Sequence, residues 1–201
     1  MIRIITDSTC EAPAEVLHHS SVTVVPLSVV FGQEALRDGV EITREQFWDR
    51  LPASNPLPTT SQAAPSDFLG LYESYAAAGD EVIVLPNNKN IVLAARQAAA
   101  MSEKHVFVVP SETIPQGIAA LLAFNSEVDI DANSESMMSA LQQVQTAEVT
   151  TAVRSAHING LEVQEGQIIG LANGKLVAVG GDIAGVVLRI LEYLHADESE
   201  I

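Results

Sequence analysis

Short apolar runs alternate with amphipathic stretches along most of the chain. Four runs predict strands, the second of them interrupted at Pro26: Ile2–Ile5, Val22–Val30, Glu81–Pro86 and Val106–Pro110. Continuous apolar runs of this length are typical of strands buried on both faces of a parallel sheet. Apolar residues at helical spacing predict helices over residues 12–17, 65–78, 91–101, 118–124 and 137–144. These repeated strand–loop–helix units predict an α/β fold with a mostly parallel, doubly wound sheet.

A stretch rich in proline and hydroxyl side chains, residues 55–75, suggests a binding site. Its prolines hold the backbone extended, so the hydroxyls of Thr59–Ser61 are expected in a stiff loop ahead of a helix that begins at Pro65. The helix is expected to bury Phe68, Leu71, Tyr72 and Tyr75. Hydroxyls followed by an apolar wall suit a ligand with a small polar head and a hydrocarbon body. The alternative is a connector whose hydroxyls form turns and caps.

The segment ahead of this stretch is predicted to be an excursion from the sheet. Residues 32–39 are expected to be rich in turns, and a helix is expected after them. Thr43 and Gln46 have the spacing of a capping box, which marks the start of that helix. Its expected buried stripe consists of Phe47, Trp48 and Leu51.

The pattern changes after Thr146. Residues 148–154 alternate between apolar and polar, and the pairs Asn159-Gly160 and Asn173-Gly174 predict hairpin turns. A final amphipathic helix is expected over residues 186–194. We therefore predict two domains, an α/β lobe over residues 1–146 and a smaller antiparallel α+β lobe, ending in a helix, over residues 147–201.

Charge narrows the range of partners. The chain has 10 lysines and arginines against 26 acidic residues, a formal net charge of -16. Such a charge repels nucleic acid and anionic membrane surfaces. No apolar run reaches the ~20 residues that span a bilayer, and the first apolar segment is too short for a signal peptide, so we expect a cytoplasmic protein without membrane insertion. Cys10 is the single cysteine, which excludes an internal disulfide.

The loops that follow the predicted strands share one chemistry. In an open parallel sheet, ligands bind beside the carboxyl ends of the strands. The loops expected there carry neutral hydrogen-bonding side chains, which together with helix N-termini can hold a carboxylate or an acyl phosphate. Taken singly, each is also accounted for as an N-cap or turn residue. The candidate ligand-binding residues in these loops are Ser8, Thr9, Thr60, Ser61, Asn87 and Asn88.

Catalytic machinery is not visible in the sequence. There is no Gly-rich phosphate loop with a lysine, no acid pair at helical spacing in a candidate pocket, and no histidine pair with the spacing of metal ligands. We therefore expect a protein that is not an enzyme and has no metal or cofactor. Arg154, close to His157 and between the predicted lobes, has the reach to touch a phosphate and joins the candidate residues. A strand-edge pair is the alternative for these two.

Two family resemblances cover nearly the whole chain. Motifs at residues 5–10 (Ile-Thr-Asp-Ser-Thr-Cys), 38–48 (Asp-Gly-Val-Glu-Ile-Thr-Arg-Glu-Gln-Phe-Trp) and 55–62 (Asn-Pro-Leu-Pro-Thr-Thr-Ser-Gln) resemble the N-terminal part of DegV-family fatty-acid-binding proteins, over residues 1–80. Residues 81–195 resemble the C-terminal, DegV-like region of the fatty acid kinase subunit, which is related to dihydroxyacetone kinases. This second resemblance lies in the motifs at 82–99, 114–125 and 148–154.

The resemblance implies a DegV-like fold and a protein that holds a long-chain fatty acid, or its acyl phosphate, and presents it to the catalytic subunit of a fatty acid kinase. It also implies that Thr60 and Ser61 hold the lipid carboxylate. The fatty-acid-binding family has Ser-Gly-Thr after the next strand, where residues 87–90 here read Asn-Asn-Lys-Asn, the kinase-subunit pattern. The alternative is therefore a regulatory or docking module of a fatty acid kinase or a dihydroxyacetone-kinase-like system that binds no lipid.

Overall fold

A four-stranded parallel sheet organises the first part of the chain. The computed structural model describes residues 1–10, 21–61 and 63–196, so the helix expected over residues 12–17 lies outside the described residues. The strands are β1 (Ile2–Asp7), β2 (Val22–Val25), β6 (Glu81–Leu85) and β7 (Val106–Val108), in the order β2-β1-β6-β7. All neighbours in this sheet are parallel. The strands predicted from the continuous apolar runs are therefore confirmed.

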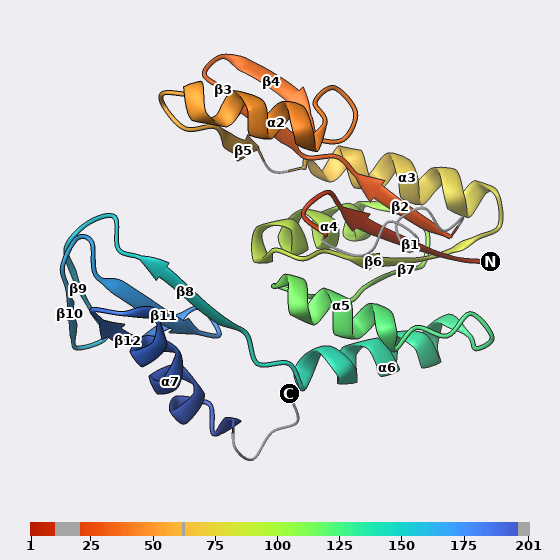
Figure 1. Cartoon of the computed structure of the whole chain (residues 1–201). Coiled ribbons are helices and arrows are strands. Elements are labelled where there is room, and N and C mark those ends of the chain that lie inside the picture. Colours follow the sequence, from red (N-terminus) through yellow and green to blue (C-terminus); the bar gives the residue numbers. More distant parts are fainter. Residues whose placement is uncertain (11–20, 62, 197–201) are drawn as a thin grey trace. The chain divides into compact units, whose positions relative to one another are not determined.

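Both faces of this sheet are covered by helices (Figure 1). The helices are α3 (Pro65–Ala77), α4 (Lys89–Met101), α5 (Ile114–Leu122) and α6 (Ile130–Gln142). Ile5 and Val84 point into a core with α3 and α4, whereas Ile4 and Ile83 point into a second core with α5 and α6. Successive strand residues thus enter opposite cores, which is why the strands are apolar without alternation. The doubly wound α/β arrangement is confirmed.

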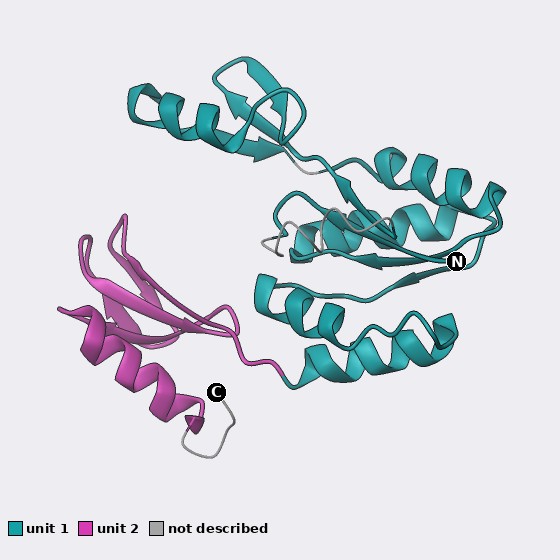
Figure 2. Cartoon of the chain, turned by 45° about the vertical axis from the view of Figure 1, so that its right-hand side comes forward, with its two compact units in different colours: residues 1–143 teal, residues 144–201 magenta. Residues whose placement is uncertain are grey.

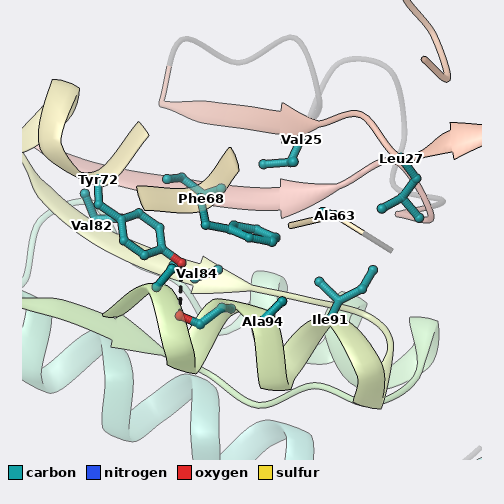
Figure 3. Close-up of a cluster of buried hydrophobic side chains, with 12 residues drawn as sticks. Val25, Leu27, Ala63, Phe68, Tyr72, Val82, Val84, Ile91 and Ala94 are labelled. Atoms are coloured by element: carbon teal, nitrogen blue, oxygen red, sulfur yellow. Dashed lines mark hydrogen bonds between the residues drawn. The ribbon is translucent and has the colours of Figure 1, made fainter. Parts of the chain in front are cut away.

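Aromatic side chains of α3 fill the first core. Phe68 and Tyr72 have no exposed surface and are among the largest fully buried side chains. Figure 3 shows them between the sheet and α4, with Leu27 and Ile91 beside them. Tyr72 Oη donates a hydrogen bond of 3.4 Å to the carbonyl oxygen of Ala95, and burial raises the pKa of Tyr72. The buried face predicted for this helix is confirmed at its two central positions.

A second, antiparallel sheet interrupts the α/β pattern and differs from the sequence-based expectation. Its strands are β3 (Ser28–Phe31), β4 (Glu34–Arg37) and β5 (Thr59–Ser61), in the order β4-β3-β5. The turn-rich excursion predicted over residues 32–39 was therefore wrong in part, because residues 34–37 form a hairpin with β3. The stiff loop predicted over Thr59–Ser61 was also wrong, since this segment pairs with β3 as an edge strand.

Helix α2 (Arg44–Arg50) lies over this small sheet and continues into the 3-10 turn η1 (Leu51–Ala53) (Figure 1). The predicted capping box is confirmed, because Thr43 Oγ1 accepts from the Gln46 amide and the Gln46 side chain accepts from the Thr43 amide. The predicted buried stripe was wrong. No residue of α2 is buried, and Trp48 is 59% exposed, because a short helix on a three-stranded sheet has no second layer above it.

The chain divides into two compact units, residues 1–143 and 144–201 (Figure 2). The second unit contains strands β8 (Ala147–Thr151), β9 (Ala156–Ile158), β10 (Leu161–Val163), β11 (Ile168–Ala172) and β12 (Lys175–Gly180), followed by helix α7 (Ile183–Tyr193). Its strand pairs are antiparallel, and the two predicted Asn-Gly hairpins are confirmed. Both asparagines and both glycines of these turns have positive φ, as type I′ turns require.

Candidate ligand site

A buried carboxylate joins the loops that follow β1 and β6. Asp7 has no exposed surface, and its Oδ1 accepts hydrogen bonds from the Thr9 amide (2.8 Å) and from the Thr9 hydroxyl. Its Oδ2 accepts from the amide of Asn87 at 3.2 Å. Because these donors come from two strands' ends, Asp7 holds the two polar loops together at one edge of the sheet. A carboxylate without such donors would be costly to bury there.

The Asn87 side chain belongs to the same network. Asn87 is 5% exposed, and its Nδ2 donates to Thr6 Oγ1 at 3.1 Å, while the Thr6 hydroxyl donates to the Leu85 carbonyl oxygen at 2.9 Å. Its Oδ1 occupies space beside α5, where a Cβ atom added to Gly117 would lie 1.8 Å away. The amide of Asn87 is therefore tied into the protein on both sides.

The other two candidate positions in these loops are more open. Asn88 is exposed and caps α4, with its Oδ1 accepting from the Asn90 amide at 2.9 Å. Ser8 is partly exposed, and its hydroxyl oxygen accepts from the Leu27 amide at 3.1 Å. A serine hydroxyl that accepts one hydrogen bond still has its own hydrogen to donate. The structure thus brings Ser8, Thr9, Asn87 and Asn88 together at the carboxyl ends of β1 and β6.

Thr60 and Ser61 lie on the edge strand β5, and both are exposed. Thr60 pairs with Val29 of β3, and Ser61 pairs with Ser28. Successive residues of a strand point to opposite faces of the sheet, so the two hydroxyls point to different faces. The sequence suggested adjacent hydroxyls that act together, but it could not show this separation, which follows from the pairing with β3.

Helix α2 identifies the face on which Thr60 lies. Phe31, two residues beyond Val29 in β3, has its ring 6.0 Å from that of Phe47 in α2. Arg50 of α2 lies 4.2 Å over the Phe31 ring and forms an ion pair of 2.6 Å with Glu34, which is opposite Phe31 in β4. Because Val29 and Phe31 share a face, Thr60 lies on the face toward α2 and Ser61 on the face away from it.

Two hydroxyl-bearing residues follow β7. Ser111 has no exposed surface, and its hydroxyl has no hydrogen-bond partner among the described residues. Thr113 caps α5, where its Oγ1 accepts from the Gln116 amide at 3.4 Å. This loop therefore contributes a helix cap and a buried hydroxyl at the third strand end of the sheet.

Arg154, the remaining candidate, belongs to the second unit. It is exposed and lies between β8 and β9. His157, which the sequence pattern placed with it, lies in β9 opposite Glu162 of β10 and is exposed as well. The sequence-based role of Arg154 in binding a phosphate stays a prediction.

Two open hollows border α2. One of about 490 Å³ lies between Phe31, Arg50 and Pro56, and one of about 280 Å³ lies between Leu36, Ile42 and Arg50. No candidate ligand-binding residue lines either of them. Within residues 1–10, 21–61 and 63–196, no group of three or more His, Cys, Asp or Glu side chains could hold a metal ion. In the same residues, no helix is both long and apolar enough to cross a membrane.

The chain shares the fold of DegV-family proteins. A fatty-acid-binding DegV-family protein from Streptococcus agalactiae superposes with a TM-score of 0.73 at 16% identity, over 100% of this chain and 79% of that one. DegV from Bacillus subtilis, described as a fatty acid binding protein, gives a TM-score of 0.70 at 22% identity, over 98% of this chain and 77% of that one. The DegV-like fold expected from the sequence is confirmed.

Residues 35–201 match the FakA-like C-terminal family of fatty acid kinases. The chain belongs to this family. Protein YloV of Bacillus subtilis is 40% identical over 122 residues, which are 61% of this chain and 22% of YloV. The match thus spans about a fifth of the length of that relative. The family range includes Thr60 and Ser61 and runs across residues 79 and 80.

Proposed function

We propose that this chain is a non-catalytic lipid-binding module that holds a long-chain fatty acid, or its acyl phosphate, and presents it to the catalytic part of a fatty acid kinase. The observation that carries the proposal is the fold. It matches fatty-acid-binding DegV proteins over nearly the whole chain, while the family is that of a fatty acid kinase component. A lipid-binding fold in a kinase-related chain favours a role in substrate presentation.

The polar residues at the carboxyl ends of the strands are suited to the lipid head group. Ser8 has a hydroxyl hydrogen left to donate, and Asn88 begins α4, whose N-terminus favours anions. Thr60 and Ser61 add exposed hydroxyls on β5. Neutral donors of this kind bind a carboxylate without a proton-transfer group, which is consistent with binding and not with catalysis.

A docking module that binds no lipid is the second candidate. It is favoured by Asn87, whose amide is committed to Thr6 and packed against Gly117, at the loop where the fatty-acid-binding family has Ser-Gly-Thr. It is also favoured by the filled core under α3, in which Phe68 and Tyr72 have no exposed surface. In that case the fold would be retained for association with a kinase.

Fatty-acid binding by a Thr60→Ala/Ser61→Ala double variant tests the first candidate. Charge-assisted hydrogen bonds contribute roughly 1.5 to 3 kcal/mol each, so we expect the affinity for oleate to fall at least about tenfold. The melting temperature should stay within the range of other surface variants, because both side chains are exposed. Ser136→Ala/Ser139→Ala, which removes two exposed hydroxyls from α6, is the matched control.

Two measurements separate the candidates. Native mass spectrometry of the protein purified from cells should show the added mass of an acyl chain, and calorimetric titration should give saturable oleate binding. A protein that carries no lipid and does not respond to oleate would refute the lipid-binding proposal. A double variant with unchanged oleate affinity but a lowered melting temperature would assign residues 59–61 to the structure of the small sheet.

A further inference from the structure

The face of the small sheet away from α2 carries a row of polar side chains. Ser28 of β3 pairs with Arg37 of β4 on one side and with Ser61 of β5 on the other. Directly paired residues point to the same face, so Arg37, Ser28 and Ser61 form one row across three strands. Their Cβ atoms are separated by roughly 5 Å from strand to strand, which lets one small anion over Ser28 reach all three side chains.

This row is close to the candidate ligand site in the chain. Ser28 directly follows Leu27, whose amide donates to Ser8 Oγ at 3.1 Å, and the Leu27 carbonyl oxygen accepts from the Asp38 amide at 2.8 Å. The first residue of β3 is thereby fixed beside the carboxyl end of β1. Ligands of parallel α/β sheets bind at that end of the strands.

The charged groups around Arg37 leave its guanidinium available. Glu34 is paired with Arg50 on the opposite face of the sheet, and the Glu41 carboxylate accepts from the backbone amide of Arg37 at 2.8 Å. Within the described residues, no carboxylate forms an ion pair with the Arg37 side chain, which is exposed. In a chain of net charge -16, such an arginine next to two hydroxyls is a local exception that attracts an anion.

The rest of this face leaves room for a ligand. The next row consists of Ala35, Val30 and Thr59, which are small side chains, and Ala35 and Thr59 are exposed. Helix α2 covers the other face, through Phe31 and Arg50. A head group can therefore approach the row of Arg37, Ser28 and Ser61 without displacing a bulky neighbour.

We infer that Arg37, Ser28 and Ser61 form the anion-binding row for the head group of the lipid, a carboxylate or an acyl phosphate. The inference rests on the proposed lipid binding and assigns the head group to the Ser61 face of β5. Arg37 supplies a guanidinium that matches the planar geometry of these anions, and the two hydroxyls donate to the remaining oxygens. Thr60, on the face toward α2, does not contact the head group.

Paired variants of the full chain test this assignment. Arg37→Gln removes the charge and keeps a polar side chain, and Arg96→Gln removes an exposed charge from α4 as its control. Ser61→Ala is matched by Thr60→Ala, one residue away on the same strand. Each variant is titrated with oleate, with oleyl phosphate and with the uncharged oleyl alcohol, and its melting temperature is measured.

We expect Arg37→Gln and Ser61→Ala each to weaken oleate binding by about tenfold, because hydrogen bonds to a charged group are lost. The two control variants should stay within about twofold of the parent protein. Oleyl alcohol should bind the parent more weakly and be insensitive to Arg37→Gln, since it has no charge. The anion whose binding suffers more from Arg37→Gln is the one for which the row is built.

Two further outcomes overturn different statements. If the parent binds oleate and both Arg37→Gln and Ser61→Ala bind it equally well, the row is refuted while lipid binding stands. The same holds if Thr60→Ala is the weakened variant. If the parent binds none of the three probes, the proposed lipid binding fails and the inference fails with it.

Discussion

The contact between Asn87 and Gly117 makes a sharp prediction about stability. A Cβ atom on Gly117 would lie 1.8 Å from Asn87 Oδ1 and 3.1 Å from its Cγ. Contacts shorter than 3.0 Å are essentially never seen for real Cβ atoms, so Gly117→Ala requires Oδ1 to move by about 1.2 Å. The Asn87 side chain cannot make this movement freely, because its Nδ2 is bonded to Thr6 in the same buried network.

The magnitude follows from three contributions. Overpacking of a buried contact costs about 1 to 3 kcal/mol, and a buried amide that loses its partner costs about 1 to 3 kcal/mol. Replacing glycine by alanine inside a helix returns up to about 1 kcal/mol. We therefore expect Gly117→Ala to lower the free energy of unfolding of the first unit by about 2 to 4 kcal/mol, measured by urea denaturation followed by circular dichroism.

Two further variants show whether the contact is the cause. In Asn87→Ala the obstructing atoms are gone, so adding Gly117→Ala to it should be neutral or stabilising, with a coupling of about 2 kcal/mol or more in the double-mutant cycle. Gly70→Ala in α3, where nothing lies within 4 Å, should stabilise the protein by up to about 1 kcal/mol. Equal destabilisation by Gly117→Ala with and without Asn87 would contradict the reasoning.

Two predictions concern pH. The hydrogen bond from Arg3 Nε to Asp80 (2.7 Å) lowers the pKa of Asp80, so its stabilising effect is present above the unfolded pKa of about 3.9 and is lost as the pH falls through the lower folded pKa. Asp80→Asn should therefore lower the melting temperature at pH 7 and have little effect at the acid end of that window; an equal effect at both pH values would refute this. Burial raises the pKa of Tyr72 above its ordinary value near 10, so its contribution is present below pH ~10 and declines as the pH rises further. Tyr72→Phe should cost less than about 1 kcal/mol at pH 7, because the hydroxyl makes one long bond, and should make unfolding less sensitive to alkali; parallel alkaline profiles of variant and parent would refute this.

The main sheet was predictable from sequence because its chemistry is local. A strand buried on both faces has to be apolar at successive positions, and β1 and β6 show this directly. The helix caps were predictable for the same reason, since Thr43 and Gln46 contact each other within one turn. In each case the residues that signal the element are also those that stabilise it.

The small sheet was not predictable in this way. β4 and β5 are short, exposed edge strands of four and three residues, so burial leaves no pattern in their sequences. In the case of β5, pairing with β3 is decided by contacts between residues that are far apart in the chain, such as Ser28 and Ser61. Helix α2 shows the converse error, because its apolar spacing is helical but the small sheet is too narrow to bury Trp48.

The candidate site combines both situations. That polar residues would gather after β1 and β6 could be expected from the parallel topology alone. Which atoms remain available could not, because Asn87 is claimed by Thr6 and by the distant Gly117, and no pattern in the sequence indicates a close approach between a loop and a helix.

Strand register decides the role of the hydroxyls on β5. A shift of β5 against β3 by one residue would exchange the faces of Thr60 and Ser61 and would place Thr60 in the row with Ser28 and Arg37. The sequence Thr-Thr-Ser offers a hydroxyl at every position, so either register would present one to a ligand. Specific weakening of anion binding by Ser61→Ala, and not by Thr60→Ala, would therefore report the register itself in solution, independently of any effect on stability.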